Sequence, residues 1–312
     1  MKTKGQTEFV WIFSLIIGAM ILFLAIYASS KVLKTGTYQT EAEIVRSFDI
    51  ILNPFSAIGS IASLTLSKEI NMPYETEMNF TCSGNSEKIS LRQVEKNNKG
   101  EWTTPYTIKN KYIFSEQIIR GKKFSAFSKP FKLPWRIDDM IYLISKNYCF
   151  INPPTKIENE LNSINATQVK VAVSSGQCGP GTNVRVCFAP NFDECSSSDA
   201  RVSYYSNYLE KNGIKSFFLD DASLYASIFS DKQTYDCNMK RLLNRLSIQT
   251  SIIMEQANIL KGCVYDSLRS DLESFKTDID SIVSIDNTAT NLITDSNKIK
   301  NLDNPNCPII NR

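Results

Sequence analysis

The sequence predicts an α+β protein with an N-terminal transmembrane helix, a disulfide-rich ectodomain that contains β-strands, and a C-terminal helical hairpin or long helix. Three observations lead to this fold class. There is one uncharged apolar run near the N-terminus, an even number of cysteines lies after it, and two kinds of hydrophobic spacing divide the remainder. Strand-like alternation occurs in the middle of the chain, and a helical stripe follows it.

The apolar run covers residues 9–28 (FVWIFSLIIGAMILFLAIYA) and contains no charged residue. A helix of this length is about 30 Å long, which matches the hydrocarbon core of a bilayer. A cleaved secretory signal is the alternative, but its apolar region spans only about 7–15 residues. We therefore expect a retained single span in the cell membrane, a short cytoplasmic N-terminus at residues 1–8, and the lipid bilayer as a partner.

All eight cysteines follow this run. No pair has CxxC spacing and the chain contains no His, which disfavours a zinc site or a thioredoxin-type redox pair. Four disulfides formed in an oxidising compartment are favoured over eight buried free thiols. The pairing stays open for the candidates, which are Cys82, Cys149, Cys178, Cys187, Cys195, Cys237, Cys263 and Cys307.

Two Asn-x-Thr triplets begin at Asn79 and Asn165 and are candidate N-glycosylation sites. Glycans of this kind and disulfides both belong to extracytoplasmic protein. Together they indicate a glycoprotein with the bulk of its chain outside the cell.

The outer chain begins with a helical stalk at residues 29–67, in which residues 40–53 have helical spacing. An α+β ectodomain with disulfides is expected at residues 68–231. Alternating apolar residues around the turn at 83–86 predict a β-hairpin, and alternation at 169–173 and 184–188 predicts a second one. Asp221 is the expected N-cap of a short helix.

A heptad-like stripe marks a helical region at residues 232–285, followed by a polar C-terminal tail at residues 286–312. The stripe predicts a helical hairpin or one long broken helix, packed within the chain rather than between copies. Its apolar members before Gly262 include Met239, Leu243 and Leu246, and those after it include Leu268, Leu272 and Phe275.

Residues 109–136 combine basic and aromatic side chains. The pattern favours a β surface with its aromatic residues inward and its lysines in water, because alternation explains it without a ligand. A patch for anionic ligands is the alternative, with Lys122, Lys123, Lys129, Lys132 and Arg136 as its candidates. The net charge of +3 is too small to indicate a nucleic-acid partner.

No catalytic residue, cofactor or metal ligand is predicted. The absence of His excludes Ser-His-Asp and Cys-His pairs and the HExxH zinc motif. The adjacent pairs Asp138-Asp139 and Asp220-Asp221 do not make an acid–base dyad on their own, since neighbouring strand residues point to opposite faces.

The opening Lys4-Gly5-Gln6-Thr7-Glu8-Phe9, followed at once by the apolar run, resembles the class III signal peptides of archaeal type IV pilin-like proteins. The resemblance covers about 25 residues and implies cleavage between Gly5 and Gln6 by a prepilin-type peptidase. It also implies that the apolar helix stays on the mature protein as an anchor and then as a filament core. The partners it implies are copies of the chain or other pilin-like subunits.

These observations favour a surface-exposed, pilin-like protein with a structural, adhesive or assembly role. A tethered binding or receptor module for a solute or surface polymer is a second hypothesis. A tethered enzyme is a third, and it requires a carboxylate cluster that joins Asp138 or Asp139 to Asp220 or Asp221.

Overall fold

The structure is a computed structural model, and it describes residues 13–29, 68–84, 86–95, 98–189, 195, 198–259, 265–282 and 290–301. The chain divides into two compact units, Met1–Phe48 and Asp49–Arg312. The predicted stalk at residues 29–67 lies outside the described residues except for its first residue. Gly5, Gln6, Cys263 and Cys307 also lie outside them.

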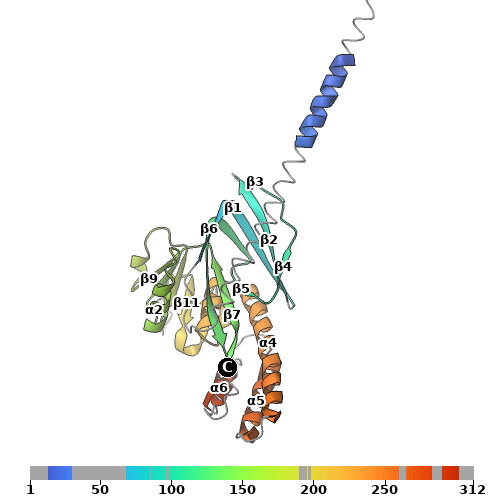
Figure 1. The fold of residues 1–312 in the computed structure, drawn as a ribbon. Coiled ribbons are helices and arrows are strands. Elements are labelled where there is room, and N and C mark those ends of the chain that lie inside the picture. The colour runs from blue at the N-terminus through green and yellow to red at the C-terminus, as the bar shows by residue number, and fades with distance from the viewer. Residues whose placement is uncertain are drawn as a thin grey trace, which may run out of the picture. The chain divides into compact units, whose positions relative to one another are not determined.

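The first unit contains a helix at residues 13–29, which is blue in Figure 1. At 1.5 Å per residue it is about 26 Å long, and residues 9–12 of the predicted span lie outside the described part. Among the described residues, no helix combines the length and the apolar character needed to cross a bilayer. The predicted transmembrane component of the fold class is therefore wrong.

The second unit has an α+β fold with two mixed sheets. The first sheet has the order β3-β2-β1-β6-β7-β5, and β4 also pairs with β2. Its strands pair antiparallel except β5 and β7, which are parallel. The bounds are β1 Lys68–Ser83, β2 Ser86–Glu95, β3 Asn98–Lys99, β4 Tyr106–Ile108, β5 Tyr112–Phe114, β6 Ile118–Lys132 and β7 Arg136–Ile144.

The hairpin predicted around residues 83–86 is confirmed as β1 and β2. Met78 lies opposite Leu91, and Phe80 lies opposite Ile89. These four side chains are buried, so the alternation marks the covered face of the sheet.

The second sheet has the order β13-β12-β11-β10-β8-β9. The four strands β11, β10, β8 and β9 run parallel, and β12 and β13 continue the sheet antiparallel. The bounds are β8 Tyr148–Ile151, β9 Val169–Ala172, β10 Val184–Phe188, β11 Ala200–Ser203, β12 Tyr208–Lys211 and β13 Ile214–Phe217.

The second predicted hairpin is wrong in its pairing, although both strands exist. The strand β8 lies between β9 and β10 and pairs in parallel with each of them. The glycine-rich segment between β9 and β10 is consequently a crossover past β8, and it carries the 3₁₀ turn η1 (Ser175–Cys178). Parallel neighbours need such a crossover, whereas a hairpin joins antiparallel strands.

The described residues form six α-helices, including the one at 13–29. The other five are α2 Thr155–Ile164, α3 Asp221–Phe229, α4 Lys232–Ile259, α5 Tyr265–Ser281 and α6 Thr290–Asn301. α3 contacts β5, β6 and β7 of the first sheet as well as β12 and β13 of the second. Residues 222–229 are all buried, so α3 joins the two sheets through one core.

Phe229 shows how this joint is packed. Its ring centroid lies 5.3 Å from that of Phe127 in the first sheet and 4.9 Å from that of Tyr148 in the second. Both pairs are edge-on, an arrangement that aromatic rings favour. The two sheets therefore share one hydrophobic core.

Asp220, not Asp221, caps α3. Its carboxylate accepts a hydrogen bond from the Ser223 backbone N–H at 2.8 Å, and the Ser223 side chain completes a capping box. The predicted cap is displaced by one residue, since α3 begins at Asp221 and the residue before it, Asp220, is the N-cap.

The helical stripe packs within the chain, as predicted. α4 and α5 fold back on each other, since Ser247 donates to Asp280 at 2.6 Å across 33 positions. The stripe residues Met239, Leu243, Leu246, Leu268, Leu272 and Phe275 belong to the main core. Part of the expected polar tail forms α6, which buries Leu292 and Ile299 in the same core.

Candidate functional site

Three disulfides join the described cysteines, which confirms the disulfide prediction for them. The pairs are Cys82–Cys237, Cys149–Cys178 and Cys187–Cys195, and no described cysteine is free. The first links β1 to α4 across 155 positions. The other two are local and lie on one face of the second sheet, together with Ile151, Ala172 and Ala189.

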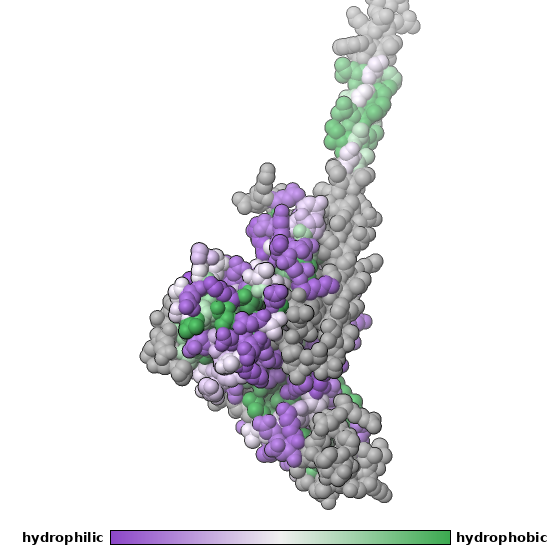
Figure 2. Space-filling view, turned by 60° about the vertical axis from the view of Figure 1, so that its left-hand side comes forward, coloured by the Kyte–Doolittle hydropathy of each residue, from purple (hydrophilic) through white to green (hydrophobic). Residues whose placement is uncertain are grey.

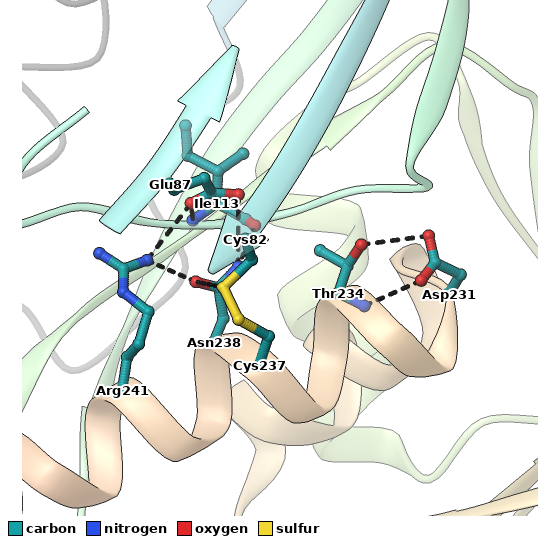
Figure 3. Close-up of a disulfide and its surroundings, with 8 residues drawn as sticks. All are labelled: Cys82, Glu87, Ile113, Asp231, Thr234, Cys237, Asn238 and Arg241. Carbon is teal, nitrogen blue, oxygen red and sulfur yellow. Dashed lines mark hydrogen bonds and ion pairs between the residues drawn. A yellow bond between two sulfur atoms is a disulfide. The ribbon is translucent and has the colours of Figure 1, made fainter. Parts of the chain in front are cut away.

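A buried polar cluster lies beside the Cys82–Cys237 disulfide (Figure 3). Glu87 of β2, opposite Cys82 in the strand pair, is fully buried. Its carboxylate accepts from the Ile113 backbone N–H at 3.1 Å and lies 3.5 Å from the guanidinium of Arg241. Asn238 donates to the Ile113 carbonyl at 2.8 Å and accepts from Arg241 at 2.6 Å.

This cluster attaches α4 to the first sheet. Burial raises the pKa of Glu87 to about 7, since loss of hydration outweighs the attraction of Arg241. The Arg241 guanidinium also lies 4.8 Å from the centre of the Tyr112 ring. A buried carboxylate with a raised pKa can mark catalysis. Its contacts in the structure join β2, the Ile113 backbone and α4, so the cluster holds these elements together.

The basic and aromatic segment follows the expected alternation only in part, because residues 124–129 of β6 are all buried and Lys111 is buried as well. Its rings are buried, and Lys122, Lys123 and Lys132 are exposed. Lys123 pairs with Glu69 at 3.1 Å, and Arg136 pairs with Asp139 at 2.6 Å. The five candidates for the anionic patch therefore do not share one exposed surface, because Lys129 is buried.

Lys129 belongs to a second polar cluster, between β6 and α2. Its ammonium pairs with Glu160, whose carboxylate also accepts from the Tyr225 hydroxyl at 3.0 Å. Nearby, Asp221 pairs with Lys156 and accepts from the Tyr204 hydroxyl at 2.8 Å. These bonds fix α2 and α3 against the sheets.

The carboxylates required by the enzyme hypothesis have separate partners. Asp138 pairs with Arg245 at 3.0 Å and Asp139 with Arg136, while Asp220 caps α3 and Asp221 pairs with Lys156. Burial raises the pKa of Asp220 to about 6. In the part of the chain that the structure describes, no three His, Cys, Asp or Glu side chains could hold a metal ion together.

The two glycosylation triplets lie in very different places. Asn79 is half-buried in β1, between β2 and β6, and its side-chain oxygen is buried without a hydrogen bond. Asn165 is exposed at the C-terminus of α2, in the left-handed region (φ 51°) that Asn tolerates. Glycan attachment requires an accessible side chain, so the geometry favours Asn165.

We expect a glycan at Asn165 and none at Asn79 when the chain is produced in a glycosylating host. Thr167→Ala should remove the glycan mass from the intact protein, because it destroys the triplet without altering the left-handed Asn. The matched variant Thr81→Ala should leave the mass unchanged apart from the substitution. Intact-mass spectrometry measures both, and a glycan lost in Thr81→Ala would contradict this prediction.

The described surface also has two neighbouring cavities at the end of the parallel strands, each of about 340 Å³. Both are lined by Asn152 and Pro153, which follow β8. The first extends over the ends of β10 and β11 to Tyr204 and Tyr205. The sequence alone does not indicate this place, because it depends on the order of strands that are distant in sequence.

Comparison with models of protein families, with curated proteins and with solved structures gives no match for this chain.

Proposed function

We propose that the chain is a subunit of an extracytoplasmic assembly, and that the helix at residues 13–29 joins copies of it. The single observation behind this proposal is that the helix is apolar all round and uncovered. Every residue of it is exposed and none is charged. Figure 2 shows hydrophobic colour over most of its surface.

Physical chemistry supports association as the use of such a helix. A helix that is hydrophobic on all sides is normally buried, and a large exposed apolar surface marks a site of interaction. Burial of one large aliphatic side chain contributes about 1.5–3 kcal/mol. The helix exposes many of them, including Leu22 at 62% and Phe23 at 69%.

Three further features support this assignment. The disulfides suit an oxidising compartment outside the cytosol. The resemblance of residues 4–9 to class III signal peptides connects this apolar helix with filament cores. A head-to-tail contact between identical subunits extends into a filament unless its rotation closes a ring.

The test compares the oxidised full chain with Leu22→Lys by analytical ultracentrifugation and electron microscopy in lipid-free buffer. We expect the wild type to form large assemblies. Leu22→Lys should raise the concentration for half-assembly at least tenfold, which corresponds to about 1.4 kcal/mol or more. The charge is placed on the helix, outside the folded core, so the circular dichroism of the second unit should be unchanged.

The matched control is Ile214→Lys. Ile214 lies on the edge strand β13 and is 53% exposed, so it receives the same change on another surface. It should assemble like the wild type. A monomeric wild type, or equal effects of the two substitutions, would overturn the proposal.

A further inference from the structure

In the second sheet, the connections that follow adjacent parallel strands run to opposite sides at one point, which lies between β8 and β10. From β8 the chain passes through α2 to β9 on one side, and then crosses to β10 on the other side. Loops that leave adjacent strands in opposite directions open a crevice at the carboxyl ends, which is where sheets of this kind bind ligands. The two cavities lie at this crevice, on either side of Asn152 and Pro153.

The chemistry of the first cavity is neutral. Aromatic and apolar side chains form part of its described wall and hydroxyl and amide groups form the rest, and none of these described lining residues is charged. The polar wall includes Asn152, Thr155, Ser203 and Ser206, and the aromatic wall includes Tyr204 and Tyr205. Tyr205 is 89% exposed, and its ring lies edge-on to that of Tyr204 with the centroids 5.7 Å apart.

The second cavity adds further amides. Asn162 and Gln177 line it together with Val171, and Glu158 is the one charged residue among its described lining. Among the described residues, no Lys or Arg lines either cavity, so this part of the walls offers no cation for an anionic ligand. The Asp221 carboxylate behind Tyr204 also disfavours an anion.

The site is held in place before any ligand arrives. The Cys149–Cys178 disulfide ties β8 to η1, and Cys187–Cys195 ties β10 to the connection that leads to β11. The Tyr204 hydroxyl is fixed by its 2.8 Å bond to Asp221. A preformed site loses less entropy on binding than a mobile one.

We propose that these paired cavities bind a neutral saccharide. Such a ligand has many hydroxyl groups for the Ser, Thr, Asn and Gln side chains, and apolar ring faces that pack against tyrosine. Each cavity lies near the lower end of the range for small-molecule sites, about 300–1,000 Å³. Their shared wall at Asn152 and Pro153 suits a ligand of more than one sugar unit. The inference does not depend on assembly through the helix at residues 13–29.

The experiment is saturation-transfer NMR on the oxidised full chain. The probes are neutral disaccharides of glucose, galactose, mannose and N-acetylglucosamine, with inorganic phosphate in parallel. We expect at least one disaccharide to bind saturably. Tyr205→Ala should weaken its binding at least tenfold, because the variant removes an exposed ring from the cavity wall without touching the core.

Tyr74→Ala is the control, since Tyr74 lies on β1 and is 50% exposed but lines neither cavity. It should change binding by less than about twofold. The proposal is overturned if no disaccharide binds more tightly than about 10 mM. It is equally overturned if phosphate binds and the sugars do not, or if Tyr205→Ala and Tyr74→Ala have equal effects.

Discussion

Replacing Cys82 and Cys237 together with serine is expected to lower the free energy of unfolding by about 5 kcal/mol. The disulfide closes a loop of 155 positions, and the chain-entropy model gives a larger stabilisation for a longer loop. Urea denaturation in non-reducing buffer measures the change. Because the bond joins β1 to α4, the variant should also lose protection of α4 in hydrogen exchange.

The matched control is the double substitution Cys187→Ser with Cys195→Ser. Its loop spans only 8 positions, for which the same model gives about 2.5 kcal/mol. Equal losses of stability in the two double variants would show that loop length does not govern the contribution of these disulfides.

The pH dependence of stability should change when Glu87 is replaced by glutamine. Burial raises the pKa of Glu87 from its ordinary value of 4.5 to about 7. Between these values the folded protein holds a proton that the unfolded chain has lost, so stability falls as the pH rises through this window. From about pH 5 to about pH 8, this one group should account for a loss of 2–3 kcal/mol.

Glu87→Gln cannot titrate, so its stability should fall less steeply over the same range, whatever its absolute level. Glu69→Gln is the control. Glu69 is exposed and its hydrogen bond from Lys123 lowers its pKa, so its titration lies below this window. Chemical denaturation at a series of pH values measures the slopes. Equal slopes in the wild type and Glu87→Gln would contradict the prediction.

Local patterns in the sequence predicted local structure well. The hairpin of β1 and β2 is an example, because alternation and a short turn at residues 83–86 specify both the strands and their pairing. The burial of Phe275 and Leu246 also follows from helical spacing alone. In these cases the residues that decide the structure are neighbours in the sequence.

Non-local pairing could not be predicted in this way. Nothing between residues 169 and 188 indicates that β8 inserts between β9 and β10, since a crossover and a hairpin can have similar loops. The paired cavities depend on that strand order, so they were missed as well. α6 was missed because its apolar residues Leu292, Ile293 and Ile299 are few and lie within an otherwise polar segment.

The disulfide between β1 and α4 has a mechanical consequence for a subunit that is pulled along its chain. Tension that enters before Cys82 passes through the sulfur atoms to Cys237 and leaves the intervening 155 positions without load. If it were fully extended, the chain between Cys82 and Cys237 would be about 500 Å long. The disulfide keeps this length from being extended, so both sheets are shielded from the pull except for β1, nearly all of which precedes Cys82.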